Sequence, residues 1–371
     1  MGTPLAGLKV VELARILAGP WAGQILADLG AEVIKIESPE GDDTRGWGPP
    51  FVENQDGGKD AAYFHATNRG KTSKVINFRT SAGQEEVQRL VADADVVIEN
   101  FKVGGLAKYG LDFASLSKIH PRLVYCSVTG FGQDGPYARR PGYDFIIQGM
   151  SGIMDLTGDP DGPPQKIGVA YADILTGLYA VIGIQAALAE RERSGLGQHV
   201  DMALLDVMVG TLANQAMNFL VSGNSPHRLG NAHPNIAPYE AFPTKDGWFI
   251  LAVGNDRQFQ SFCKVVEIAP GAVFSTNAQR LERKAELSAM VAEATGKWLR
   301  QDLLVALEKA GVPAGPINTV ADAFAEPQIA HRGMQLDITD ENGRHTPGVR
   351  LPIRFSRSEI AKPRASPQLQ L

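Results

Sequence analysis

The first part of the chain alternates between two hydrophobic periods, and this alternation restricts the fold more than any other feature. Two β-rich runs, Leu8–Leu13 and Ala31–Glu37, flank Ala18–Leu29, which has the spacing of a helix. Strand, helix and strand within about 30 residues make a βαβ unit and imply a parallel sheet. The pattern continues through strand Lys74–Phe78, helix Ser81–Ala92, strand Asp95–Glu99, helix Leu106–Ile119 and strand Arg122–Thr129. The first ~150 residues are therefore predicted to form a doubly wound, Rossmann-like α/β domain.

A glycine motif in this half invites a dinucleotide-binding interpretation. Gly130–Gly135 matches G-x-G-x-x-G directly after a predicted strand. That fingerprint requires a helix to open at the glycines, so that its amino terminus can hold a pyrophosphate. Pro136 and Pro141 follow instead and argue against a regular helix. The motif alone does not predict an NAD site.

The stretch Gly168–Gly177 places one carboxylate, Asp173, at the start of a long apolar segment. Two interpretations stay open from the local sequence. An acid at this place is most often a helix cap that accepts hydrogen bonds from free N–H groups. It can also be a catalytic nucleophile if its surroundings activate it. The helix is expected to run to about Arg193 and to end at Ser194–Gly197.

A strand and a further helix, Gln198–Leu204 and Asp206–Leu220, precede a change of composition. Ser222–Pro238 is rich in turn-forming residues and marks a linker or functional loop into a second domain. In that domain a hairpin is expected from Tyr239–Phe242 and Trp248–Val253, with helices near Asp256–Val266, Arg280–Ala294 and Trp298–Ala310. From Pro327 short strands and turns return, and Lys362–Leu371 shows no pattern.

Composition and charge restrict the class of protein. Hydrophobic residues make up 44% of the chain and charged residues 21%, as in ordinary soluble proteins. Charged residues or glycines interrupt each apolar run before the roughly 18 residues of a membrane span, and the amino terminus lacks the pattern of a signal peptide. Two cysteines, Cys126 and Cys263, cannot form a disulfide framework. We expect a cytoplasmic protein that does not bind membranes, and the net charge of −5 argues against a nucleic-acid partner.

Common catalytic signatures are missing from the sequence. The seven histidines show no H-E-x-x-H or other paired metal spacing, so no metal site is expected. Neither G-x-S-x-G nor a phosphate-binding P-loop is present. The frequent hydrolase and NTPase classes are therefore not indicated.

Basic residues gather where glycine and asparagine allow close backbone approach. They are Arg45, Arg69, Lys71, Lys108, Arg139 and Arg140. Each by itself is most often solvated surface. Together they are compatible with a site for an anionic ligand in an otherwise acidic protein.

Many short blocks, in one order, give the chain a family resemblance. They include Val10–Leu13, Ala18–Pro20, Leu29–Glu37, Asp42–Trp47, Asn68–Lys71, Val97–Phe101, Gly130–Gly132, Gly142–Asp144, Gly168–Gly177 and Gly195–Gln198. With these blocks the chain resembles the class III (CaiB/BaiF) CoA-transferase family from Leu5 to about Phe355. Within the family, Asp42–Phe51, Arg228–His233 and Ala323–Gln328 look most like succinyl-CoA:glutarate-type dicarboxylate CoA-transferases.

The resemblance implies an architecture as well as an activity. It implies a large Rossmann-like α/β domain from 1–221 and 326–371, a smaller α+β domain from 222–325, and an interlocked homodimer. The implied reaction moves CoA from an acyl-CoA to a free carboxylic acid. Coenzyme A is then a substrate, and no permanently bound cofactor or metal is expected.

Site residues follow from the resemblance position by position. Asp173 is the implied nucleophile. The implied CoA contacts are Ile16, Leu17, Ala18, Arg45, Asn100, Phe101, Lys108, Arg140 and Tyr143. The implied substrate pocket contains Trp47, Tyr63, Asn231 and His233. The sequence departs from the family at Lys108, where some members have arginine, and at Gly230–Pro234, which is poorer in glycine than the lid of formyl-CoA transferase.

The implied chemistry passes through a mixed anhydride and an aspartyl-CoA thioester on Asp173. Its difficulty is the leaving group, because a carboxylate of pKa about 3.9 must displace a thiolate whose thiol has a pKa of about 8.5. That difference makes the first step uphill by roughly 6 kcal/mol. Binding energy from the distant nucleotide of CoA can offset this cost.

Two other functions stay open at this point. An α-methylacyl-CoA racemase would share the fold and the acid, but racemases pair that acid with a histidine in the segment matching Gly142–Asp144, where this chain has Tyr143. A racemase would incorporate solvent deuterium at the α-carbon without any acceptor acid. A CoA-binding protein without transferase activity would bind CoA but exchange no label between free acid and acyl-CoA.

Overall fold

The computed structural model describes residues 2–54, 57–340 and 343–369 and divides into two compact units. The first unit contains Met1–Met154, Lys166–Asn224 and Pro327–Leu371, and the second contains Asp155–Gln165 and Ser225–Glu326. The segment Asp155–Gln165 thus belongs to the second unit, whereas the domain boundaries expected from sequence place it in the large domain. Its contacts explain why: Arg228 Nη1 donates to Asp155 Oδ1 at 2.7 Å, and Gly230 N donates to Gly158 O at 3.1 Å.

The first unit is built on a six-stranded sheet in which every paired strand runs parallel. Its strands are β1 (Lys9–Glu12), β2 (Glu32–Glu37), β5 (Thr72–Val75), β6 (Val96–Glu99), β7 (Val124–Thr129) and β8 (His199–Ala203). They lie in the order β5-β2-β1-β6-β7-β8. In chain order this is third, second, first, fourth, fifth and sixth, the arrangement of dinucleotide-binding folds, and the parallel sheet predicted from sequence is confirmed.

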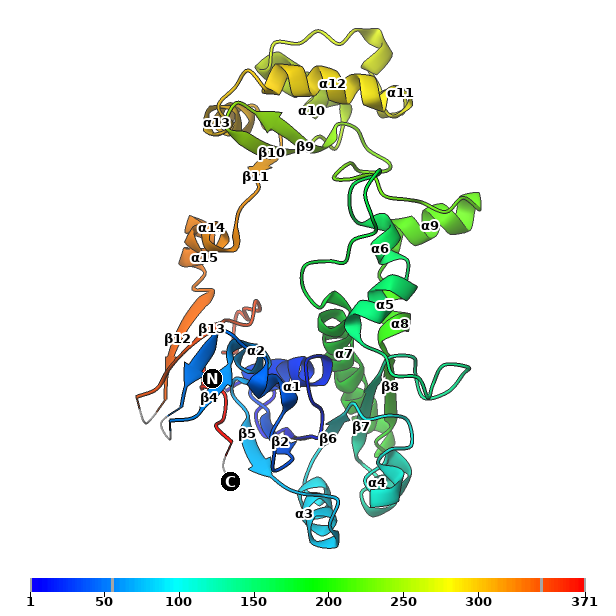
Figure 1. The fold of residues 1–371 in the computed structure, drawn as a ribbon, viewed down its shortest axis with the longest axis vertical. Coiled ribbons are helices and arrows are strands. Elements are labelled where there is room, and N and C mark those ends of the chain that lie inside the picture. The colour runs from blue at the N-terminus through cyan, green and yellow to red at the C-terminus, as the bar shows by residue number, and fades with distance from the viewer. Residues whose placement is uncertain (1, 55–56, 341–342, 370–371) are drawn as a thin grey trace. The chain divides into compact units, whose positions relative to one another are not determined.

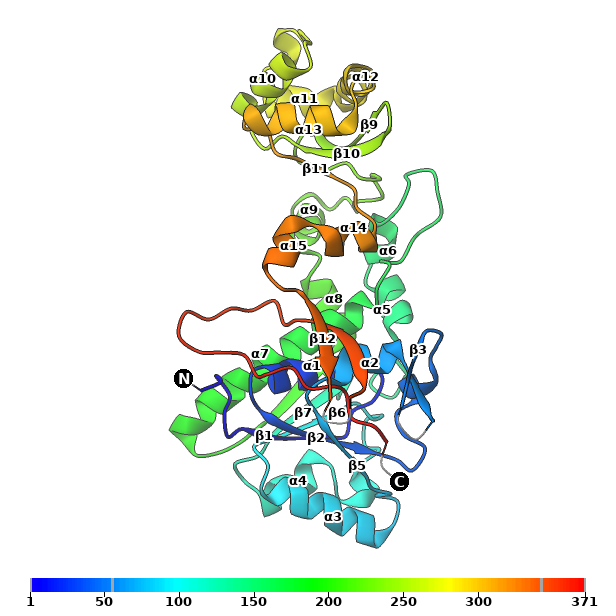
Figure 2. The same ribbon diagram turned by 90° about the vertical axis from the view of Figure 1, so that its left-hand side faces the viewer.

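Alternate residues of each central strand enter opposite cores, which is why successive residues such as Val10 and Val11 are both apolar. Val10, Ile98 and Cys126 pack on one face, while Val11 and Tyr125 pack on the other. The first face is covered by α1 (Ala18–Asp28) and α7 (Tyr171–Ser194), and the second by α3 (Ser81–Ala92) and α4 (Phe113–Ile119), as Figure 2 shows.

Several elements of the first unit differ from the expected ones. The helix expected over Leu106–Ile119 is a 3₁₀ turn, η2 (Ala107–Tyr109), followed by α4, because Gly110 between them has a left-handed φ of 65°. The helix expected over Asp206–Leu220 is two helices, α8 (Leu204–Gly210) and α9 (Ala213–Ser222), bent by 73°. Elements without a sequence signal are η1 (Asp43–Gly46), β3 (Phe51–Glu53), β4 (Lys59–Ala61), α2 (Ala62–Asn68), α5 (Asp144–Met150) and α6 (Ile153–Leu156).

The carboxy-terminal segment returns to the first unit (Figure 1). It contains α15 (Pro327–His331) and the antiparallel hairpin β12 (Gln335–Thr339) and β13 (His345–Val349). Arg344 Nη1 donates to Asn54 Oδ1 at 2.7 Å, and Ala361 N donates to Asp28 O at 2.8 Å. The tail from Lys362, which shows no sequence pattern, is held in the same way: Arg344 Nη2 donates to Ser366 O at 2.7 Å, and Gly70 N donates to Arg364 O at 3.1 Å. Residues 370 and 371 lie outside the described residues.

Helix α7 has the length and composition of a membrane span, which the sequence did not lead us to expect of any segment. One 18-residue window has a mean hydropathy of 1.6, so the helix could cross a membrane by length and composition alone. Its Ala180, Ile184 and Ala187 are buried in the same core as α1 and the sheet. These contacts are those of a core helix in a globular α/β unit.

The second unit is a three-stranded antiparallel sheet with helices on one face. Its elements are β9 (Tyr239–Thr244), β10 (Gly247–Ala252), β11 (Ala314–Pro316), α10 (Asp256–Val265), η3 (Ala272–Phe274), α11 (Asn277–Glu282), α12 (Lys284–Thr295), α13 (Arg300–Lys309) and α14 (Val320–Ala325). The expected hairpin is present as β9 and β10. Phe249 and Leu251 of β10 are buried, whereas Trp248 and Ile250 face the other side and are exposed.

Candidate active site

A cavity of about 750 Å³ lies in the first unit at the carboxyl ends of its strands. It is lined by the segments that follow β1, β6 and β7, together with Asp173 near the start of α7. Because β1 and β6 are neighbours from which the chain winds in opposite directions, this is the topological switch point of the sheet. Ligands of open α/β folds bind at this point.

Ten of the fourteen site residues implied by the resemblance line this one cavity. They are Ile16, Leu17, Ala18, Trp47, Asn100, Phe101, Lys108, Arg140, Tyr143 and Asp173. They come from five separate stretches of sequence, so the fold brings together residues that no local pattern connects. Their individual roles stay predictions.

The other four do not line this cavity. The Arg45 guanidinium is buried between two carboxylates, with Nη2 2.6 Å from Glu37 Oε1 and Nη1 3.0 Å from Asp60 Oδ2, which makes it a structural cation. Tyr63 packs edge-on against Trp47 at a centroid distance of 5.3 Å. Burial, followed by the charges of Asp173 and Asp144, raises the pKa of Tyr63 to about 12.

Asn231 and His233 belong to the second unit. There His233 Nδ1 accepts a hydrogen bond from Asn235 N at 3.0 Å, and its ring packs against Tyr239. Their place in a substrate pocket stays a prediction.

Other basic residues grouped by sequence are also structural. Arg69 pairs with Asp28, and Lys71 Nζ lies 2.8 Å from Glu12 Oε2, all four side chains being buried. The basic residues that do line the cavity beside Lys108 and Arg140 are Arg15, Arg79 and Lys102, which sequence reasoning missed. Each of the three follows a strand at its carboxyl end, and that position in the βαβ pattern was the available signal.

Asp173 does not cap α7. The helix begins at Tyr171, so Asp173 is its third residue, and the residue before the helix, Ala170, has no side chain that can cap. Asp144 supplies the acceptor instead: its Oδ1 receives hydrogen bonds from Ala172 N at 2.8 Å and Asp173 N at 3.3 Å. Its Oδ2 accepts from Gln148 Nε2 at 2.8 Å. The carboxylate of Asp173 is thereby left to the cavity.

Two glycines bring α7 and the loop after β7 close to the other walls. A Cβ on Gly177, one turn after Asp173, would lie 2.7 Å from Ala18 O, so only glycine lets α7 approach the start of α1 this closely. A Cβ on Gly130 would lie 2.5 Å from the Cα of Gly142. This contact holds Tyr143 and Asp144 near the end of β7.

The electrostatic setting of Asp173 is unusual for an aspartate. Burial, with a smaller contribution from the neighbouring charge of Asp144, raises its pKa to about 7. A carboxylate that is poorly solvated and destabilised in this way is a stronger base and nucleophile than a surface aspartate. The arrangement suits covalent catalysis at a carbonyl carbon.

The described part of the chain offers no candidate metal site. Among residues 2–54, 57–340 and 343–369, no cluster of three histidine, cysteine, aspartate or glutamate side chains is placed to hold a metal ion.

Comparison with known proteins agrees with this geometry. A model of CoA-transferase family III matches residues 5–370. The chain is 58% identical over 371 residues to the succinate–glutarate CoA-transferase of Agrobacterium fabrum, covering 99% of this chain and 93% of that protein. It is 39% identical to the human succinyl-CoA:glutarate CoA-transferase, covering 99% and 83% of the two chains.

Solved structures give the same result. A CaiB/BaiF family protein from Brucella suis superposes with a TM-score of 0.90 at 62% identity, covering 100% of this chain and 97% of that one. Rv3272 from Mycobacterium tuberculosis superposes with a TM-score of 0.86 at 29% identity, covering 99% and 97%. The resemblance inferred from sequence is confirmed: the chain belongs to CoA-transferase family III and is an acyl-CoA:carboxylate CoA-transferase.

Proposed function

We propose that this enzyme transfers CoA from succinyl-CoA to glutarate or a similar dicarboxylic acid, with Asp173 as the covalent carrier. One observation carries the proposal: a partly buried carboxylate of raised pKa and several basic side chains line the same cavity. The names of the Agrobacterium and human relatives support the choice of donor and acceptor.

The basic residues give the cavity a direction. Arg15, Arg79, Lys102 and Lys108 come from the segments after β1, β5 and β6, while Asp173 comes from α7. CoA carries phosphates at its nucleotide end and its thioester at the other end. The phosphates therefore pair with the cations, and the pantetheine arm leads the thioester to Asp173.

The proposed reaction has four steps. The Asp173 carboxylate attacks the thioester carbonyl and the C–S bond breaks. CoA leaves as a thiolate, and Asp173 and succinate are then joined as a mixed anhydride. The thiolate attacks the aspartyl carbonyl of the anhydride, forming an Asp173–CoA thioester and releasing succinate. The acceptor carboxylate attacks this thioester to give a second anhydride and thiolate. The thiolate then attacks the acceptor's acyl carbon, so the new acyl-CoA leaves and Asp173 is restored as a carboxylate.

The raised pKa of Asp173 lowers the cost of the first step. A carboxylate whose pKa is about 7 is only about 1.5 units less basic than a thiolate whose pKa is about 8.5. The corresponding penalty is about 2 kcal/mol, compared with roughly 6 kcal/mol for an ordinary aspartate. The raised pKa of Asp173 thus reduces the leaving-group mismatch, and less binding energy from the nucleotide is required.

The direct test is a transfer assay with succinyl-CoA and glutarate, following glutaryl-CoA and succinate by chromatography. Formation of both products in equal amounts supports the proposal. If the protein transfers CoA to other acids but forms no glutaryl-CoA, the proposed acceptor is wrong while the reaction class stands.

The rate is expected to depend on pH through Asp173. The attacking species is the carboxylate, so kcat/KM for succinyl-CoA should rise about tenfold per unit below pH 7 and level off above it. Asp144→Asn keeps an oxygen that can accept the Ala172 N–H but removes the neighbouring charge. The rising part of the pH profile of this variant, its acid limb, should move to lower pH. Its midpoint should stay above 3.8, because burial is the larger cause of the raised pKa of Asp173. A limb that stays in place or moves upward would contradict this assignment.

The interlocked homodimer is also part of the proposal. Leu178, Tyr179 and Ile182 of α7 are exposed in the single chain, with Ile182 61% exposed. Such an apolar row on a long helix is normally covered by a partner. A second copy of the chain supplies that cover, and sedimentation at micromolar concentration should give about twice 39.8 kDa. A monomer at this concentration would exclude it.

A further inference from the structure

The loop between β1 and α1 adopts a backbone conformation that its sequence does not favour. Ile16 has a φ of 71°, in the left-handed region, where β-branched residues are rarely found. Such a conformation persists only when the surrounding structure imposes it. Ile16, Leu17 and Ala18 line the same cavity as Asp173, so this conformation shapes a wall of the proposed substrate site.

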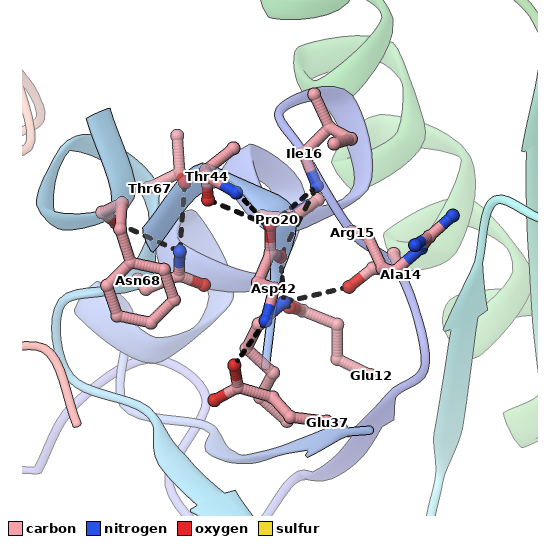
Figure 3. A network of polar contacts seen from close by, with 12 residues as sticks. Glu12, Ala14, Arg15, Ile16, Pro20, Glu37, Asp42, Thr44, Thr67 and Asn68 are labelled. Atoms are coloured by element: carbon pink, nitrogen blue, oxygen red, sulfur yellow. Dashed lines mark hydrogen bonds and ion pairs between the residues drawn. The ribbon is translucent and has the colours of Figure 1, made fainter. Parts of the chain in front are cut away.

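Side chains from four other segments contact the backbone between Ala14 and Pro20, that is, this loop and the first turn of α1. Figure 3 shows one of them, Asp42, beside Ile16. Lys35 Nζ donates to Ala14 O at 2.8 Å, and Lys71 Nζ donates to Pro20 O at 2.9 Å. Asn100 Oδ1 accepts from Arg15 N at 2.9 Å, and Asn100 Nδ2 donates to Arg15 O at 2.6 Å. The Asp42 carboxylate accepts from Ile16 N at 3.3 and 3.4 Å. Among these four side chains, Asp42 is the one that accepts a hydrogen bond from Ile16 itself.

Other groups hold the Asp42 carboxylate in place. Its Oδ2 lies 2.9 Å from Lys35 Nζ, and its Oδ1 accepts from Thr44 N at 3.0 Å and Thr44 Oγ1 at 2.8 Å. The residue is 2% exposed. Lys35 and Lys71 both pair with Glu12, at 3.2 and 2.8 Å.

A buried ionic network of this kind contributes little net stability, because desolvation offsets the attraction between the charges. Apolar side chains of similar volume would fill the same space. The network instead fixes the Asp42 carboxylate beside the N–H of Ile16. It orients the loop that faces Asp173.

We infer that Asp42 is a positioning residue of the CoA-transfer reaction, which holds the left-handed Ile16 so that the Ile16–Ala18 backbone is preset against the thioester beside Asp173. The inference rests on the proposed function. The N-cap of α1, Leu17, has no side-chain acceptor, so the N–H groups of Ala18 and Gly19 in the first turn remain for water or a ligand. Loss of the hold on Ile16 shifts these groups relative to Asp173, and small shifts of this kind cost large factors in rate.

The test compares Asp42→Asn with a matched control, Asp28→Asn. Asp28 is also a buried, ion-paired aspartate of the same unit, but it pairs with Arg69 at the far end of α1 and does not line the cavity. Asp42→Asn should lower kcat about 100-fold and change KM for succinyl-CoA less than about fivefold. Asp28→Asn should lower the unfolding temperature with kcat within about threefold of wild type.

Two further variants separate charge from position and from strain. Asp42→Glu keeps the ion pair with Lys35 but displaces the oxygen that receives the Ile16 N–H, so kcat should fall about tenfold in a folded protein. Ile16→Gly adopts the left-handed conformation without strain. Asp42→Asn should therefore cost about tenfold less in the Ile16→Gly background than in wild type.

Hydrogen exchange of the 13–21 peptide provides a readout that needs no turnover. Asp42→Asn and Asp42→Glu should both speed exchange in this peptide, and Asp28→Asn should not. If the wild type fails to transfer CoA from succinyl-CoA, the proposed function fails, and the exchange data still decide the role of Asp42. If Asp42→Asn does not fold, Asp42→Glu decides. Unchanged exchange, or a kcat for Asp42→Glu equal to that of Asp28→Asn, would overturn the inference.

Discussion

Asp173→Asn is expected to lower the rate of CoA transfer by about 10⁴-fold or more, because an amide cannot attack the thioester as the carboxylate does. Binding of acyl-CoA should survive, since the cations that line the cavity are unchanged. The measurement is kcat and the Kd for CoA, by transfer assay and calorimetry.

A second helix, α13, offers a matched control for this substitution. Asp302 is the third residue of α13, as Asp173 is of α7, and it is exposed. Asp302→Asn removes the same charge from the same helical position, so any effect through the helix dipole would appear in both variants. Transfer at the wild-type rate by Asp173→Asn would show that the nucleophile is another group.

The same substitution is expected to stabilise the protein at pH 8. The folded-state pKa of Asp173 is about 7 against an ordinary value of 3.8, so the contribution of this group to stability is complete below about pH 4 and is lost as pH rises through 7. At pH 8 the wild type keeps a poorly solvated charge in the cavity, at a cost of about 2 to 4 kcal/mol. Asn carries no charge and avoids that cost.

Thermal midpoints measured at pH 4 and pH 8 test this expectation. Asp173→Asn should exceed the wild type by several degrees at pH 8 and match it at pH 4, while Asp302→Asn should differ little at either pH. A gain that is equal at both pH values would mean that packing, rather than charge, is responsible. Such a result would also remove the physical basis for the raised nucleophilicity of Asp173.

The parts of the fold that sequence predicts are those with strong local periodicity. The central residues of strands such as β1 and β6, Val10–Val11 and Val96–Ile98, are apolar and buried, so the βαβ pattern is clear although both strands end in a glutamate. The hairpin of β3 and β4 has three residues in each strand, which is too short for any period to be recognised. The packing of the carboxy-terminal segment on the first unit depends on distant partners such as Asn54 and has no local signal.

The site is predictable where motifs mark positions and unpredictable where partners decide roles. Asp173 and the Ile16–Ala18 loop follow from the family blocks, and both line the cavity. Arg45 looks equally suited to an anionic ligand in sequence, but Glu37 and Asp60 neutralise it in the folded chain. Nothing near Asp144 in sequence indicates that it accepts the first N–H groups of α7. Such long-range pairings require the three-dimensional structure.

The covalent role of Asp173 is the central claim, and intact mass spectrometry tests it most directly. Incubation with succinyl-CoA in the absence of an acceptor should add the mass of CoA less one water to the protein. Peptide mapping should place this adduct on Asp173, and hydroxylamine should convert it to a hydroxamate at that residue. An enzyme that turns over succinyl-CoA and glutarate but never carries an adduct on Asp173, even with hydroxylamine present, would contradict the account.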